Sequence, residues 1–288
     1  MIYKLLAINI DGTLLQSNGR FSKAAKEAIE YVQAKDVAIA LVTSRNYQSC
    51  KKIAKSLRIN PMIIAAQGAF VGMAVGKPLF VQKLPELLTI NAVKSLEDMQ
   101  CQIKVNYEAL EIRNRINLPE NLLGKAVMYV SEQKIFAQGY VDQVSDYLLS
   151  NDARPLSVEA DFQSYKERQE WMGIAQALFK DATIIPKEHN RVIIVSKSVG
   201  KWQGLLRLAD HLKIERQEIV AIGDSADDGE MIAASGIGVA MGNSPYELKC
   251  KANWITRGND DDGVAYMVKE LFRKQYQLQF LEKMNLLK

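Results

Sequence analysis

The sequence predicts an α/β protein in which a doubly wound, Rossmann-like parallel sheet is interrupted by an inserted α+β domain. In the first third of the chain, nearly continuous apolar runs alternate with helical patterns. The middle third loses this rhythm and the last third regains it. Strand–helix–strand repeats form right-handed crossovers between parallel strands that are buried on both faces. The outer thirds are therefore expected to share one sheet, and the middle third to form a second domain.

The first third contains three apolar runs that are typical of buried strands. They span residues 2–10, 37–42 and 62–66. Ser22 is suited to cap a helix after the first run, because Ala25, Ile29 and Val32 follow at helical spacing. A second helical stretch, near residues 49–57, separates the other two runs.

The middle segment, residues 84–186, alternates more between apolar and polar residues. A half-exposed strand is predicted at residues 102–107, with Ile103 and Val105 on one face, and a helix at 165–179. This segment is expected to be the inserted cap. The expected boundaries are residues 1–83 and 187–288 for a discontinuous core domain, and 84–186 for the cap.

The last third resumes the alternation of strands and helices. Strands are predicted at residues 192–195, 218–222, 236–240 and 254–256, and helices at 202–212 and 231–234. The chain ends in a long amphipathic helical pattern over residues 263–288. Its apolar stripe is expected to pack on the protein's own core, and docking on a partner is the alternative. The stripe comprises Phe272, Tyr276, Phe280 and Met284.

Charge and cysteine content argue against several classes of function. The chain has 37 basic and 33 acidic residues, a net charge of +4 and no basic cluster, so nucleic acid is not an expected partner. No apolar run has the length of a membrane span, so no membrane association is expected. Cys50, Cys101 and Cys250 form no C-x-x-C pair, which argues against a zinc site or a disulfide framework. A cytoplasmic monomer or weak homodimer is expected.

Polar residues follow the predicted core strands at the points where each strand ends. They are Asn9, Asp11, Gly12, Thr13, Thr43, Ser44, Arg45, Gln67, Gly68, Asp224, Ser225, Asp227 and Asp228, with Lys201 at a helix start. Ligands of parallel sheets bind at this edge, so these side chains are expected to gather there. Taken singly, each also fits a turn, a helix cap or a solvated lysine.

Together, these residue types predict metal-assisted phosphoryl transfer. Carboxylates can hold Mg²⁺, and a threonine hydroxyl with backbone N–H groups can hold a phosphate. A lysine can neutralise the transferring phosphoryl group, and a further carboxylate can act as general acid. No G-x-G-x-x-G follows the first strand, which argues against a dinucleotide-binding enzyme.

Four motifs stand in a fixed order along the chain. They are Ile10-Asp11-Gly12-Thr13-Leu14-Leu15, Val42-Thr43-Ser44-Arg45, Val199-Gly200-Lys201 and Gly223-Asp224-Ser225-Ala226-Asp227-Asp228. In this order they resemble the haloacid dehalogenase-like (HAD) hydrolase superfamily, in its Cof-type phosphatase branch with a class IIB α/β cap. The resemblance implies a Mg²⁺-dependent phosphatase that works through an aspartyl-phosphate intermediate. Small phosphorylated metabolites would be its substrates, and the cap would choose among them.

The resemblance also implies roles for individual residues. Asp11 matches the general acid/base and gives a backbone carbonyl to the metal. Thr43 matches the phosphate-binding hydroxyl, and Lys201 the charge-neutralising lysine. Asp224 and Asp228 match the acids that hold Mg²⁺. The expected phosphate-binding set also includes Gly12, Ser44 and Asp227.

Asn9 stands where the family has its nucleophilic aspartate and one of its metal ligands. A carboxylate can attack phosphorus, whereas a neutral carboxamide is a very poor nucleophile, although its oxygen can still face Mg²⁺. Three interpretations follow from this residue. In the first interpretation, the protein is a phosphatase of low activity, either because Asp11 activates water directly or because some Asn9 deamidates to aspartate. The bulky Ile10 that follows Asn9 opposes fast deamidation. Alternatively, the protein is a silent phospho-ligand binder, or the asparagine was introduced to trap a ligand. Milder departures from the family pattern occur at Ser44, Gln67 and Asp227.

Overall fold

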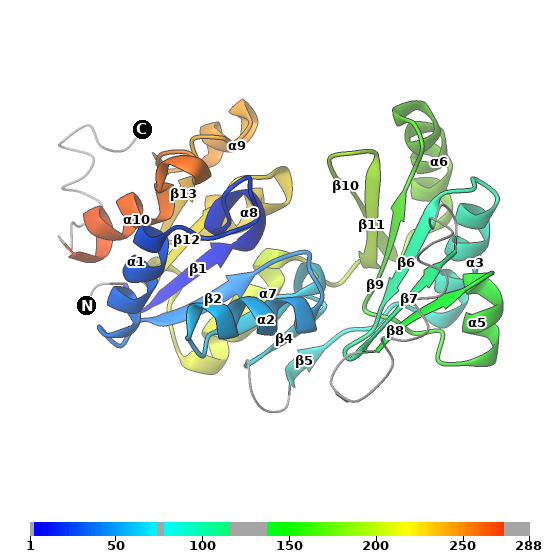
Figure 1. Ribbon diagram of the computed structural model, residues 1–288, viewed down its shortest axis with the longest axis horizontal. Helices are drawn as coiled ribbons and strands as arrows, with labels where there is room; N and C mark the ends of the chain where they lie inside the picture. The colour runs from blue at the N-terminus through cyan, green and yellow to red at the C-terminus, as the bar shows by residue number, and fades with distance from the viewer. Residues whose placement is uncertain (1–2, 74–77, 116–136, 274–288) are drawn as a thin grey trace. The chain divides into compact units, whose positions relative to one another are not determined.

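The computed structural model describes residues 3–73, 78–115 and 137–273, which divide into two units (Figure 1). The first unit comprises the described residues up to Arg45, Ser49–Phe80, and those from Gly200 onward. The second comprises Asn46–Gln48 and the described residues of Val81–Val199. One unit therefore interrupts the other, as the sequence predicts.

The first unit is built on a sheet whose order, in the described residues, is β14-β13-β12-β1-β2-β3-β4-β5. Neighbours from β14 to β3 run parallel, and β4 runs antiparallel to β3. The strands are β1 (Leu5–Asn9), β2 (Ala38–Val42), β3 (Met62–Ala65), β4 (Phe70–Met73), β5 (Pro78–Val81), β12 (Ile219–Gly223), β13 (Ile237–Ala240) and β14 (Trp254–Ile255). Every residue of β1 and β12 is buried, which explains their continuous apolar runs.

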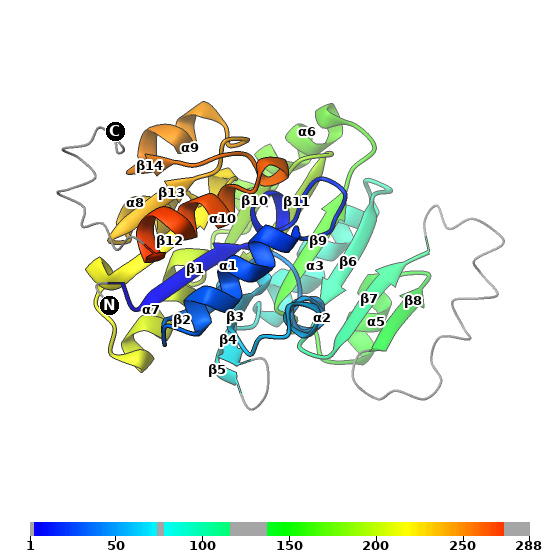
Figure 2. The ribbon, with the colours of Figure 1, turned by 60° about the vertical axis from the view of Figure 1, so that its left-hand side comes forward.

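Helices cover both faces of this sheet. One face packs on apolar side chains from α7 and α8, including Leu205, Leu208 and Met231. On the other face, α1 and α10 lie side by side (Figure 2). The helices of this unit are α1 (Lys23–Gln33), α2 (Tyr47–Leu57), α7 (Lys201–Leu212), α8 (Gly229–Ala234), α9 (Tyr246–Lys251) and α10 (Gly263–Val268). Ser22 caps α1 as expected, because its side chain accepts from the Ala25 N–H.

The second unit holds a mixed sheet whose described strands run in the order β10-β11-β9-β6-β7-β8. Its strands are β6 (Gln102–Asn106), β7 (Leu110–Asn114), β8 (Ala137–Val141), β9 (Ser157–Asp161), β10 (Ala182–Pro186) and β11 (Arg191–Ser196). Its helices are α3 (Glu86–Glu97), α5 (Val144–Ser150) and α6 (Tyr165–Leu178). Ile103 and Val105 join one apolar core with Trp171 of α6, as their alternation predicts.

The expected return to the core at residue 187 is wrong. β11 pairs antiparallel with both β9 and β10, so it is an inner strand of the second sheet. Val192 to Val195 are all buried there, and a strand buried on both faces has the same apolar run in either sheet. The second unit consequently extends to Val199.

Only the first part of the helix predicted at residues 263–288 lies within the described residues. α10 ends at Val268 and continues as a π-helical turn, Lys269–Arg273, in which Phe272 is buried against Tyr3 with ring centroids 6.0 Å apart. The rest of the expected stripe lies outside the described residues. None of the helices in the described part of the chain is long and apolar enough to cross a membrane.

Candidate active site

The candidate site lies at the carboxyl-terminal edge of the first unit's sheet. Asn9 ends β1 beside the last residue of β2, so Thr43 follows at the same edge. Ile8 pairs with Ile222 of β12, which brings Asp224 to this edge two residues later. Parallel strands place their carboxyl ends together, which is the physical reason that distant motifs meet.

The turn after β1 needs glycine at position 12. Gly12 has φ +71°, and a Cβ there would lie 2.3 Å from Asp224 Oδ2. Its carbonyl accepts a hydrogen bond of 2.9 Å from Asn243 Nδ2. The glycine therefore permits both the left-handed backbone and the close approach of the acidic loop.

Gly12→Ala should destabilise the protein more than Gly19→Ala. Both glycines have positive φ, of +71° and +76°, but a Cβ at Gly19 would meet no heavy atom within 4 Å. Gly19→Ala carries only the backbone strain, about 1–2 kcal/mol. Gly12→Ala adds the clash with Asp224, so its loss of unfolding free energy in a denaturant titration should be clearly larger. Equal losses would contradict the close approach.

The Asn9 side chain is 4% exposed and is held from two sides. Its Nδ2 donates to the backbone carbonyl of Asp11 and to Asp224 Oδ1, both at 2.8 Å. Its Oδ1 accepts from Lys201 Nζ at 3.3 Å. Asp224 Oδ1 also accepts from the Thr13 hydroxyl at 2.6 Å. Asn9 thus joins the acidic loop after β12 to the lysine at the start of α7.

Lys201 is buried among two carboxylates. Its Nζ lies 2.6 Å from Asp228 Oδ1 and 2.9 Å from Asp227 Oδ2. Burial lowers the pKa of Lys201, but the attraction of Asp228 and then Asp227 outweighs it, so the pKa is raised above the ordinary value of a lysine. The ammonium group consequently stays charged in the interior.

Packing and hydrogen bonds fix this lysine and its partners. A Cβ at Gly68, where φ is +90°, would lie 2.1 Å from the Gly200 carbonyl oxygen. The backbone of the loop after β3 therefore packs closely against the residue before α7. Asp228 Oδ2 accepts from the Ser225 N–H at 3.0 Å and also from the Ser225 hydroxyl. Both oxygens of Asp228 thus have protein partners.

Thr43, Ser44 and Arg45 directly follow β2. Thr43 is fully buried, and its Oγ1 accepts from the Arg45 N–H at 3.1 Å. Ser44 is half-buried next to it. Arg45 donates two hydrogen bonds to the exposed carboxylate of Asp11. Its Nε lies 2.7 Å from Oδ2, and its Nη2 lies 2.5 Å from Oδ1. This two-point ion pair fixes the direction of the Asp11 side chain.

Burial, and then the charge of Asp228, raise the pKa of Asp224 to about 6. Hydrogen bonds from Thr13 and Asn9 and the charge of Lys201 act in the opposite direction. Because the folded protein binds this proton more tightly than the unfolded chain, the contribution of Asp224 to stability should fall as pH rises from about 4 to 6. Above that range the carboxylate costs about 3 kcal/mol, from a shift of roughly two pKa units.

Asp224→Asn should therefore raise the free energy of unfolding at pH 7 by up to about 3 kcal/mol. Asparagine keeps an oxygen that accepts from Asn9 and Thr13. The gain should vanish below about pH 4, where the wild-type carboxyl is protonated in both states. Denaturant titrations in EDTA at several pH values measure this difference, with Asp210→Asn as an exposed control. A gain that does not change with pH would contradict the raised pKa.

The residues in this arrangement do not fit a divalent cation. The Asn9 NH₂ group contacts the Asp11 carbonyl and Asp224 Oδ1, the oxygens that a cation would join. A nitrogen with two N–H donors offers no lone pair to Mg²⁺, which requires oxygen ligands. In this arrangement the Asn9 oxygen faces Lys201 and not the position expected for a metal.

Residues 6–268 match the family described as haloacid dehalogenase-like hydrolase. The chain belongs to this family. It is 38% identical over 286 residues to the stress response protein YhaX of Bacillus subtilis, and the alignment covers 99% of each chain. It is 27% identical to a 5-amino-6-(5-phospho-D-ribitylamino)uracil phosphatase of the same organism, YwtE, over 95% of this chain and 99% of that protein. By homology it is a phosphatase-type member, of the Cof-type branch.

The solved structures agree on the fold. A haloacid dehalogenase-like hydrolase from B. subtilis superposes with a TM-score of 0.81 at 24% identity. The match covers 93% of this chain and 99% of that chain. A parallel core sheet with an inserted mixed sheet, as predicted from the sequence, is thereby confirmed.

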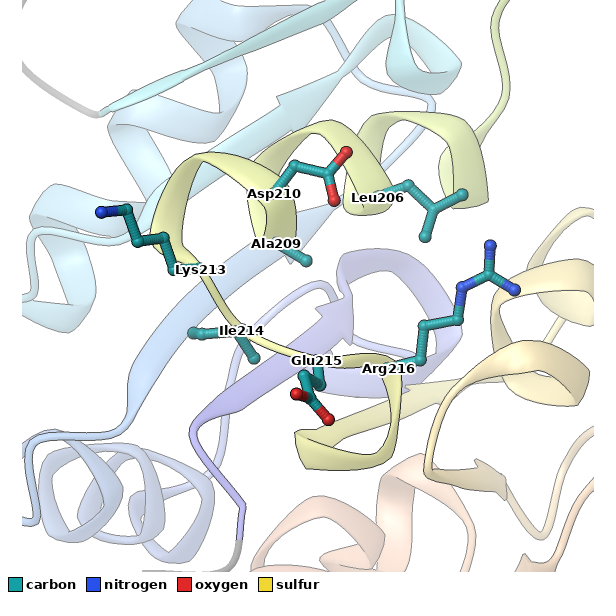
Figure 3. Close-up of a pocket in the computed structure, with 7 residues that line it drawn as sticks. All are labelled: Leu206, Ala209, Asp210, Lys213, Ile214, Glu215 and Arg216. Carbon is teal, nitrogen blue, oxygen red and sulfur yellow. The ribbon is translucent and has the colours of Figure 1, made fainter.

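A surface cavity of about 520 Å³ lies elsewhere in the first unit (Figure 3). Leu206, Ala209, Asp210, Lys213, Ile214, Glu215 and Arg216 line it. None of these lining residues is one of the site residues described above. The cavity is therefore not part of the candidate site.

Three residues of the site network had no catalytic, phosphate-binding or metal-binding role assigned to them from the sequence. Arg45 holds Asp11, Gln67 donates to Asp227 at 2.7 Å, and Asn243 donates to the turn after β1. Arg45 and Gln67 do follow predicted strands, so their positions were a usable signal. Their contacts depend on side-chain geometry and cannot be read from spacing.

Proposed function

We propose that the protein binds a small phosphorylated metabolite at this edge of the sheet and hydrolyses it only very slowly. The observation that carries this proposal is the position of Asn9. Its carboxamide is buried between Asp224 and Lys201, where the resemblance implies an attacking carboxylate. This position supports a binding role, because a carboxamide cannot form an acyl phosphate.

Several groups at this edge of the sheet support the binding of a phosphate. Thr43 uses its Oγ1 as an acceptor for the Arg45 N–H, which leaves its hydroxyl hydrogen to donate to a phosphate oxygen. Backbone N–H groups near Gly12 and Ser44 would add donors, and Lys201 supplies the positive charge. Asp227 pairs with Lys201, so the proposal gives it the role of holding the lysine.

Direct attack by water is expected to be slow. Asp11 is the exposed carboxylate nearest in sequence to Asn9 and would have to activate that water. Arg45 engages both of its oxygens, so a water molecule must compete with a two-point ion pair. Mg²⁺ is the cofactor that the resemblance implies. Asp224 and the Asp11 carbonyl could hold it only after the Asn9 NH₂ group had moved away from both oxygens. No step of the proposed reaction therefore depends on Mg²⁺.

The proposal assigns substrate choice to the second unit. The sheet face opposite its apolar core carries polar residues: Asn106 Nδ2 donates to Ser157 Oγ at 3.0 Å and to Glu159 Oε1 at 2.8 Å. Lys104 pairs with Glu159 at 2.6 Å. Such groups suit the hydroxyls of a polyol or sugar phosphate. The name of the relative YwtE, which specifies a phosphoribityl compound, is in keeping with this class.

The test measures binding and turnover separately on the wild-type protein. Ribitol phosphate and a panel of sugar phosphates are titrated by calorimetry, and release of inorganic phosphate is followed with Mg²⁺ present. We expect saturable binding that Thr43→Val weakens, with release close to the uncatalysed rate. Efficient turnover by the wild type would overturn the proposal, as would binding of every ester that ignores Thr43→Val.

A further inference from the structure

The Asn9 carboxamide has chemically different neighbours on its two sides. One side faces acceptors, namely the carbonyl of Asp11 and the carboxylate of Asp224. The other side faces a donor, the ammonium group of Lys201. With Nδ2 toward the acceptors and Oδ1 toward the donor, all three contacts are hydrogen bonds. The reverse orientation would set the Asn9 oxygen against two acceptors and its NH₂ group against the ammonium group.

A carboxylate at this position would behave differently. Its two oxygens both accept, so one can face a cation while the other faces Lys201. A carboxamide has a single oxygen and can satisfy only one side. A cation that joined Asp11 O and Asp224 Oδ1 would meet two N–H donors of Asn9, or would force the amide to turn toward the reverse orientation.

We infer that the NH₂ group of Asn9 takes the place of the divalent cation in this site, so that the protein binds Mg²⁺ or Mn²⁺ far more weakly than its Asn9→Asp variant. The NH₂ group joins the same two oxygens that a cation would join, and it does so by hydrogen bonds. The arrangement of the turn after β1 and the loop after β12 is then held without metal. The inference rests on the proposed function only for the placing of the site.

Metal binding is tested without any enzymatic assay. Mn²⁺ titrations followed by electron paramagnetic resonance compare the wild type, Asn9→Asp and Asn18→Asp. The last variant adds the same charge in the same segment but at an exposed turn. Asn9→Asp should bind Mn²⁺ at least about tenfold more tightly than the wild type, because even changes to the groups that hydrogen-bond to metal ligands alter affinity by about 10–100-fold. Asn18→Asp should match the wild type, and Asp224→Ala in the Asn9→Asp background should abolish the gain.

A second measurement compares the thermal unfolding midpoint in EDTA and in millimolar Mg²⁺. The midpoint of the wild type should be the same in both, a result that does not depend on how well a variant folds. Mg²⁺ should raise the midpoint of Asn9→Asp. Tight Mn²⁺ binding by the wild type that Asp224→Ala removes would overturn the inference. Failure of phosphate esters to bind either protein would instead refute the proposed function and leave the metal result standing.

Discussion

Asn9→Asp should increase the rate of phosphate-ester hydrolysis in the presence of Mg²⁺ by on the order of 10³-fold or more. Loss of a catalytic nucleophile costs a hydrolase up to about 10⁶ in kcat, so restoring one can recover a large part of that factor. The substitution keeps the size of the side chain and places an acceptor toward Asp11 and Asp224, where Nδ2 now donates. Release of inorganic phosphate from ribitol phosphate and sugar phosphates measures the gain.

Two further variants separate a gained nucleophile from a general charge effect. Asn18→Asp adds an equal charge at an exposed turn and should leave the rate at the wild-type level. Adding Lys201→Met to Asn9→Asp should remove most of the gain, because the buried ammonium group contacts position 9. An Asn9→Asp protein that stays inactive on every ester would refute the assignment of position 9 as the nucleophile position.

Lys201→Met should destabilise the protein by about 3–5 kcal/mol, the usual cost of removing one partner from a buried ion pair. The ammonium group lies within 3 Å of two carboxylates, at 2.6 Å from Asp228 and 2.9 Å from Asp227. Methionine fills a similar volume but leaves both charges without their cation. Denaturant unfolding at pH 7 gives the loss of free energy directly.

The matched control is Lys23→Met, whose side chain is 91% exposed and which should change stability by less than about 1 kcal/mol. A second comparison combines Lys201→Met with Asp228→Asn, which removes one of the abandoned charges and should recover part of the stability. A loss for Lys201→Met that is no larger than that for Lys23→Met would show that the buried ion pair contributes nothing measurable.

Much of the first unit could be predicted from the sequence because its strands have an environment that dictates their composition. β1 and β12 are buried on both faces, so they read as unbroken apolar runs, and polar residues begin where the strands end. Parallel pairing then requires those strand ends to meet. Asn9, Thr43 and Asp224 could therefore be placed at one edge from the sequence alone.

The remaining features depend on contacts that no pattern encodes. β11 has the same apolar run as a core strand, and only its pairing with β9 and β10 assigns it to the second sheet. The two-point ion pair between Arg45 and Asp11 and the orientation of the Asn9 amide likewise depend on which donors and acceptors lie nearby. The position of Asn9 at the end of a predicted strand was enough to place it in the site. Its amide orientation depends on Lys201, which donates to Oδ1, and on Asp224, which accepts from Nδ2.

The most direct test of the account is whether position 9 can carry a phosphoryl group. The wild type and Asn9→Asp are each mixed with a phosphate ester that binds, quenched in acid and analysed by mass spectrometry of the N-terminal peptide. We expect a phosphoryl adduct at position 9 of the Asn9→Asp variant and none on the wild type. An adduct on the wild-type peptide, or its absence from a variant that releases phosphate rapidly, would contradict the claim that the carboxamide of Asn9 limits turnover in this site.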